Sequence, residues 1–122
     1  DGLGVQNVYL GSYTRIDGTS VTGASLADLV TSADPALDAE MRAKLSTTMR
    51  ELGAIKTVAE SGMAYDQMLE AGNAAGEELI MGGVDALIDQ TRSIERIVTV
   101  LGVDQIEFES SDSLDNPGAV FE

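Results

Sequence analysis

The sequence predicts an all-α protein built on an antiparallel hairpin of two long helices, which forms part of a four-helix bundle. Apolar residues recur at helical spacing in two segments, 34–60 and 77–101, and neither segment sustains the period-two alternation of a strand. The chain is 43% hydrophobic with two prolines, a composition that can bury a core. We expect short helices and a loop over 1–33, half of a helical bundle over 34–103, and an acidic extended tail over 104–122.

The first third of the chain is predicted to hold short elements. Residues 1–10 favour a short helix or the tail of a helix that begins upstream, although three glycines in and next to the segment weaken that pattern. Asp17 and Gly18 form a strong turn pair between apolar and β-branched residues. We therefore expect either a small hairpin or an ordered loop over 12–23.

Two helix starts follow. Ser25 can cap a short helix, with Asp28 three residues later in the capping-box position. Asp34 and Pro35 form the clearest helix start in the chain, because Asp caps free amides and Pro at the first helical position has no donor to leave unpaired. This first long helix is predicted to run to about Glu60.

The first long helix carries an apolar seam with steps of four and three residues. Gly53 lies inside this helix, costs about 1 kcal/mol relative to Ala, and is expected to allow a neighbour to approach closely. A short helix over 63–71 follows, and Gly72 and Asn73 separate it from the second long helix. The seam consists of Leu37, Met41, Leu45, Met49, Leu52, Ile55 and Val58.

The second long helix, 77–101, has an apolar seam with alternating steps of four and three, which is the spacing of a gently left-handed bundle. Gly102 is expected to close it in the left-handed conformation. Gly76, Gly82 and Gly83 indicate either a close helix crossing or irregular first turns. The seam consists of Ile80, Val84, Leu87, Thr91, Ile94, Val98 and Leu101.

The apolar stripe on each long helix is wider than a single neighbouring helix would cover. We therefore predict that the two helices complete a four-helix arrangement with helices from another chain or from sequence outside this one.

Composition excludes several classes of function. The formal net charge is −14 and the basic residues do not cluster, which argues against nucleic acid or an anionic membrane surface as a partner. No Cys or His is present, so disulfides, thiolate chemistry and histidine ligands to zinc are excluded. The longest apolar run is far too short to span a membrane.

Acidic side chains on the second long helix could form a cation site. Glu78, Asp85 and Asp89 lie on whole turns of that helix, and hard cations prefer several carboxylate oxygens. The interpretation that we favour is a solvated acidic face with Arg92 and Arg96 nearby.

The tyrosines allow two interpretations as well. Tyr9, Tyr13 and Tyr65 either line a pocket or are buried tyrosines that each make one hydrogen bond.

A block near the start of the chain resembles a known family. Residues 4–13 read Gly-Val-Gln-Asn-Val-Tyr-Leu-Gly-Ser-Tyr and are followed by Asp-Gly, which is similar to the opening of the second half of imelysin-like proteins, a peptidase family that includes proteins of the iron-regulated protein A type. The resemblance extends over residues 3–103. Further matching segments follow in the expected order at 23–30, 34–38, 65–67 and 90–91.

The resemblance implies an all-α protein of two related helical bundles that is exported to the periplasm or cell surface. Members are linked to iron or haem acquisition, and some are described as metallopeptidases. The family's metal motif, G-x-H-x-x-E, belongs to the N-terminal half, and a chain without His cannot supply it. The resemblance therefore carries no metal or catalytic residue to this sequence.

We accordingly expect this chain to be the C-terminal half of an imelysin-like protein, forming one wall of a cleft. Its partner would be the N-terminal half, present as a separate chain after cleavage near Asp1, which would hold any iron, haem or zinc. Part of a metallopeptidase and a structural helical module are the alternatives. Tyr9, Tyr13 and Asp66 are the predicted cleft-facing residues, because they lie in the matching blocks and can form hydrogen bonds.

Overall fold

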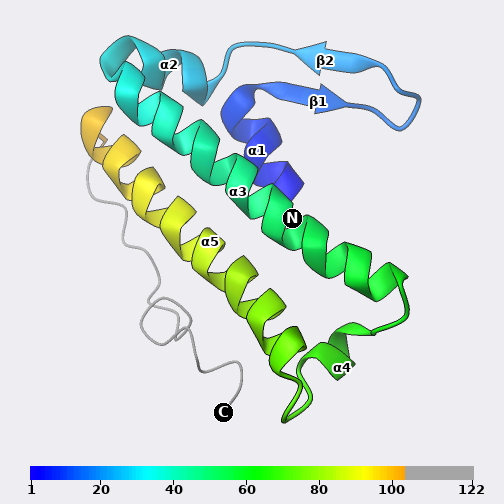
Figure 1. Cartoon of the computed structure of the whole chain (residues 1–122). Coiled ribbons are helices and arrows are strands. Elements are labelled where there is room, and N and C mark those ends of the chain that lie inside the picture. The colour runs from blue at the N-terminus through cyan, green and yellow to red at the C-terminus, as the bar shows by residue number, and fades with distance from the viewer. Residues whose placement is uncertain (104–122) are drawn as a thin grey trace.

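The computed structural model describes residues 1–103, and the predicted acidic tail over 104–122 lies outside the described residues. The described part is mainly helical, as predicted, with one small sheet (Figure 1). Its elements are α1 (Gly2–Leu10), β1 (Ser12–Thr14), β2 (Ser20–Thr22), α2 (Leu26–Ala33), α3 (Pro35–Glu60), α4 (Tyr65–Met68) and α5 (Ala74–Val100).

The predicted hairpin of two long helices is confirmed. Helices α3 and α5 lie side by side in opposite directions, and α4 lies in the connection at one end (Figure 1). Helices α1 and α2 pack on α3 at the other end. The buried core is concentrated at that end, where α1, α2, α3 and α5 all contribute to it. It consists of Tyr9, Ala27, Val30, Leu37, Met41, Leu45 and Ile97.

Both predicted helix starts have the expected capping contacts. The Asp34 carboxylate accepts hydrogen bonds from the amides of Ala36 and Leu37 at 3.1 and 3.0 Å. Ser25 and Asp28 form a reciprocal capping box, with both side chain to backbone distances at 3.1 Å. These contacts satisfy amides that an unpaired helix end would leave without partners.

Of the two alternatives for the glycines at the start of α5, the close crossing is correct. The helix is regular from Ala74, three residues earlier than predicted, because the Asn73 side chain accepts from the Gly76 amide at 3.0 Å. A Cβ at Gly76 would lie 2.6 Å from the Met68 Cα, so α4 packs directly on the backbone of α5. The short helix predicted over 63–71 is confined to Tyr65–Met68.

The expectation for Gly53 is wrong in the described part of the chain. A Cβ at this position would have no atom within 4 Å, so no neighbour uses the space that the glycine leaves.

The burial of the long helices shows that the predicted seams are only partly covered. In α3, Leu37, Met41 and Leu45 are buried, whereas the seam residues from Met49 onward are only half-buried. In α5, Leu87 is 39% exposed. The α5 face turned toward α3 is rotated from the predicted seam and comprises Ile80, Gly83, Ala86, Gln90, Ser93 and Ile97. One neighbouring helix therefore leaves part of each stripe uncovered.

Residues 12–22 form the small antiparallel hairpin that was one of the two expected alternatives, with Tyr13 opposite Val21. Gly18 has a φ of 84° at the turn, a conformation that favours glycine. The hairpin projects from the helices at the end of the molecule near α2 (Figure 1). Within residues 1–103, no helix combines the length and apolar character that crossing a bilayer requires.

Candidate functional site

The structure places the three predicted cleft residues in different surroundings. Tyr9 lies in α1 and is only 4% exposed, whereas Tyr13 lies in β1 and is 51% exposed. Asp66 is exposed in α4, at the opposite end of the α3–α5 pair from α1 and the hairpin (Figure 1). The three side chains therefore do not gather at one site.

Tyr9 is a buried tyrosine with one hydrogen bond, which was one of the two interpretations. Its hydroxyl donates to Asp38 Oδ1 at 2.9 Å, and Arg42 Nε donates to Asp38 Oδ2 at 2.8 Å. Burial of Asp38, which is 7% exposed, favours a raised pKa, but the hydrogen bonds from Arg42 and Tyr9 outweigh it and lower the pKa of Asp38. This network joins α1 to α3.

The same network acts on the phenol of Tyr9. Its burial raises the pKa of Tyr9 most, and the hydrogen bond to Asp38 and the negative charge of Asp38 raise the pKa further. The hydroxyl of Tyr9 therefore stays protonated at neutral pH, and it can donate a hydrogen bond to the ionised carboxylate of Asp38.

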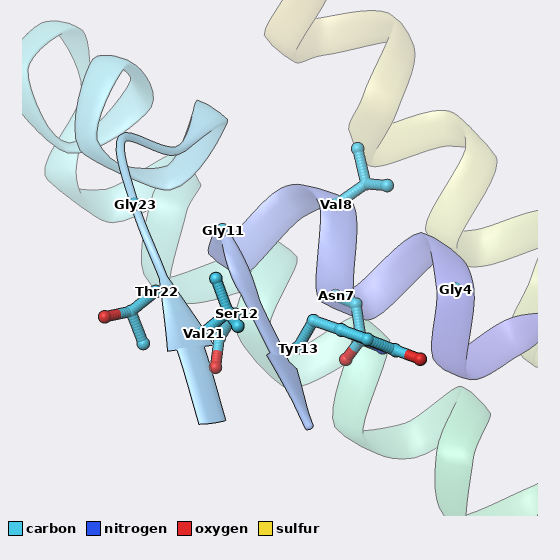
Figure 2. Close-up of a pocket in the computed structure, with 9 residues that line it drawn as sticks. All are labelled: Gly4, Asn7, Val8, Gly11, Ser12, Tyr13, Val21, Thr22 and Gly23. Carbon is cyan, nitrogen blue, oxygen red and sulfur yellow. The ribbon is translucent and has the colours of Figure 1, made fainter. Parts of the chain in front are cut away.

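A pocket of about 450 Å³ lies between α1 and the hairpin, and we call it the hairpin pocket (Figure 2). The Tyr13 ring extends from the hairpin toward α1, while the Val8 side chain points away from the hairpin. Asn7, Ser12 and Tyr13 line the pocket, but the surface that they and their neighbours present to it is almost entirely apolar. The pocket is lined by Gly4, Asn7, Val8, Gly11, Ser12, Tyr13, Val21, Thr22 and Gly23.

Gly11 fixes the geometry of the hairpin pocket. It ends α1 with a φ of 61°, and a Cβ there would lie 2.7 Å from Ser25 Cβ. Its carbonyl accepts from the Gly23 amide at 2.9 Å, which closes the open end of the hairpin. A left-handed residue without a side chain is therefore required where the chain leaves α1 and enters the hairpin.

An apolar groove of about 400 Å³ lies on the other side of Val8. Val8 itself is 70% exposed and lines both hollows. Met41 of α3 contributes to the groove, and Ile94 of α5 lies across from α1. We call it the α1–α5 groove, and it is lined by Gly4, Val5, Val8, Tyr9, Leu26, Met41, Ile94 and Ile97.

Of the three acidic residues on α5 that could have formed a cation site, Asp89 is in ion pairs with Lys44 and Arg92, and Glu78 and Asp85 are exposed. Lys44 Nζ donates to Asp89 at 2.8 Å, and this hydrogen bond, followed by the charge of Lys44, lowers the pKa of Asp89. One turn earlier in α3, the carboxylate of Glu40 accepts from Ser93 at 2.9 Å and from Arg96 at 2.6 Å. Among residues 1–103, no three acidic side chains converge in a way that could hold a metal ion.

Sequence reasoning missed Asp38 and Asn7. Asp38 lies in the first turn of the helix that begins at Pro35, where an acidic side chain is favoured by the helix dipole. The pattern gave no sign that it would be buried against a residue 29 positions away. Asn7 lies in the block that carries the family resemblance, between Gln6 and Val8, and its place in that block was the available signal.

The comparisons with known proteins agree with the sequence resemblance. A family model described as Imelysin matches residues 2–94, which include α1, the hairpin pocket, α3 and most of α5. Among curated proteins, none matches the chain.

Proposed function

The chain belongs to the imelysin family, and we propose that it forms one wall of a ligand-binding cleft in an exported protein that binds or takes up iron or haem. In this proposal the wall is the end of the molecule that carries α1 and the hairpin. Tyr13 and the exposed Val8 face outward there, and the hairpin pocket and the α1–α5 groove adjoin each other at Val8. In this proposal Tyr9 does not face the cleft but is buried under the wall, where its hydrogen bond to Asp38 holds α1 on α3. Asp66 lies away from this wall.

The residues of this wall do not fit a metal site. The surface of the hairpin pocket is almost entirely apolar, and its lining residues include no carboxylate, imidazole or thiolate, which are the usual protein ligands for zinc and iron. Tyr13 is the one lining residue of a type that can ligate haem iron, and a single phenol does not make a metal site. In the proposal, iron, haem iron or zinc is therefore ligated by groups from a part of the protein outside this sequence. The chain described here contributes shape and apolar contact.

The α1–α5 groove supports the proposal most strongly. Helices α1, α3 and α5 occupy three positions of a bundle, and the groove between α1 and α5 is apolar, with the buried Met41 of α3 among its lining residues. Helix α1 also carries apolar residues on several faces, with Leu3, Val5 and Val8 exposed. A helix that is apolar all round is typical of a buried position. We propose that a helix from the N-terminal part of an imelysin-like protein fills this groove.

The proposal is tested by producing this chain together with the N-terminal part of the protein and titrating the complex with ferric iron and with haem. We expect saturable binding that is weakened when Val8→Asp places a charge at the edge of the wall, whereas Ile16→Asp, at the tip of the hairpin, leaves binding unchanged. Fractionation of the source cells should place the complex in the periplasm or at the cell surface.

Two results would overturn the proposal. Cleavage of an unfolded polypeptide that a chelator abolishes, without binding of iron or haem, would identify a metallopeptidase instead. A stable complex that neither binds iron or haem nor cleaves would identify a structural helical module.

A further inference from the structure

Helix α5 carries an apolar stripe that the other helices described here do not cover in full. Its residues follow one another at steps of three and four, so they share one side of the helix, rotated away from the face that α3 buries. Leu87 is 39% exposed and the other members are half-buried. We call this surface the α5 stripe, and it consists of Val84, Leu87, Thr91, Ile94 and Val98.

The end of α5 holds the chain beside this stripe. Gly102 has a φ of 67°, and its amide donates to the carbonyl of Thr99 at 3.2 Å. The Val103 amide donates to the carbonyl of Val98 at 3.2 Å. This pair of hydrogen bonds turns the chain out of the helix axis and keeps Val103 against the last turn of the helix. The next part of the chain therefore starts at a residue of the α5 stripe.

The sequence that follows, which lies outside the described residues, has a composition that suits this stripe. Ile106 and Phe108 alternate with Glu107 and Glu109, which is the period-two pattern of an extended segment with one apolar side. Both phenylalanines of the chain lie between residues 104 and 122. Aromatic side chains bury more apolar surface than most others, so Phe108 gains most from contact with a partly uncovered stripe.

We propose that residues 104–109 lie extended along the α5 stripe, with Ile106 packed on Ile94 and Phe108 packed on Thr91. The acidic side of the segment then faces water. A second copy of the chain is a poorer occupant, because each copy has a formal net charge of −14 and two copies repel one another. The segment is instead tethered beside the stripe, which gives it an effective concentration on the order of millimolar.

The length of the segment agrees with this placement. An extended chain spans about 3.3 Å per residue, so Phe108 can reach about 17 Å from Val103. Thr91 lies about 15 Å before Leu101 along the axis of α5, at about 1.5 Å per residue. Phe108 can therefore reach Thr91 without any change in α5.

The proposal does not depend on the role in iron or haem binding. Leu87, Thr91 and Val98 do not line the α1–α5 groove, and Phe108 is placed on Thr91. A helix that fails to occupy the groove would leave this contact unchanged.

The first test uses the complete, unmodified chain. NMR should show contacts between the ring of Phe108 and the methyl groups of Thr91 and Ile94. In a mixture of isotope-labelled and unlabelled chains, these contacts should occur within one chain. Contacts between different chains would identify a second copy as the occupant and would overturn the proposal, as would the absence of any contact from Phe108 to the stripe.

The second test measures access to the stripe. The chain contains no Cys, so Thr91→Cys introduces a single thiol there, and its rate of labelling by a thiol reagent reports how well it is covered. Adding Phe108→Asp should speed this labelling by about fivefold or more, because a charged side chain does not pack on apolar surface. The matched control, Phe121→Asp, changes the other phenylalanine of the same segment and should alter the rate by less than about twofold.

Labelling of Ile16→Cys at the tip of the hairpin should be the same with and without either substitution. An unchanged rate at Thr91→Cys in the Phe108→Asp chain, or equal increases for Phe108→Asp and Phe121→Asp, would overturn the proposal. Because the NMR contacts are measured in the unmodified chain, a variant that fails to fold does not weaken the test.

Discussion

Removing the hydroxyl group of Tyr9 tests whether the buried network fixes α1 on α3. Tyr9→Phe keeps the ring in the core but leaves Asp38 Oδ1 without its donor at 2.9 Å, in a side chain that is 7% exposed. A hydrogen bond to a charged group contributes about 1.5–3 kcal/mol, so we expect a loss of that size in the free energy of unfolding. For a chain of this length the melting temperature should fall by roughly 5–15 °C.

The assay is urea unfolding followed by circular dichroism, with Tyr65→Phe as the matched control because Tyr65 is 56% exposed and its hydroxyl has no partner among the described residues. The control should unfold like the unmodified chain. In an Asp38→Ala background, Tyr9→Phe should cost much less, since the two groups act as a pair. An equal loss in both backgrounds would refute the network as the cause.

The pH dependence of this loss has a defined sign. The pKa of Asp38 in the folded chain lies below its ordinary value of 3.8, so its ionised form stabilises the fold above that pH and the stabilisation disappears as the pH falls through the folded pKa. The difference between the unmodified chain and Tyr9→Phe should therefore be full at neutral pH and should narrow below about pH 4. A difference that grows on acidification would contradict this assignment.

Three further predictions concern stability, each measured by urea unfolding. Gly76→Ala should destabilise the chain by about 1–3 kcal/mol, because its Cβ would collide with the backbone of Met68. Gly53→Ala should stabilise it by about 0.5–1 kcal/mol, because its Cβ meets open space. A change of the same sign in the free energy of unfolding for both variants would contradict the packing of α4 on α5. Stability should fall above about pH 10, since the pKa of Tyr9 is raised in the folded chain and deprotonation favours unfolding; a flat profile in that range would show that Tyr9 is not buried in solution. Gln90→Met should be neutral or stabilising by up to about 1 kcal/mol, because it removes a buried Oε1 without a partner among the described residues; a large loss would mean that this oxygen has a partner in solution.

The sequence was sufficient for the features that depend on neighbours along the chain. Asp34 and Ser25 cap the helices that follow them because capping is decided within three residues. The long helices and the turn at Gly18 likewise follow from local spacing and backbone preference. These elements could be placed to within a few residues.

Features that depend on contacts between distant segments could not be placed in the same way. The apolar stripe of α5 is wide enough to dock at several rotations, and packing on α3 buries Ser93 and Gln90 while Leu87 stays partly exposed. Gly76 is required by α4, a contact that helical spacing does not encode. For the candidate site, the block around Tyr13 was found from the resemblance. That block did not indicate that Tyr9 would be buried against Asp38 while Tyr13 stays exposed in the hairpin.

The proposed function requires that a helix from the N-terminal part of an imelysin-like protein occupies the α1–α5 groove. The chain contains no Cys, so Val8→Cys introduces a single thiol at the edge of the groove. The decisive measurement is the rate at which a thiol reagent labels this residue, in the chain alone and in its complex with the N-terminal part. We predict labelling at least about tenfold slower in the complex, because burial controls access to the thiol, with no change for Ile16→Cys at the tip of the hairpin. Equal labelling rates of Val8→Cys in the two forms would show that no helix occupies the α1–α5 groove in the complex.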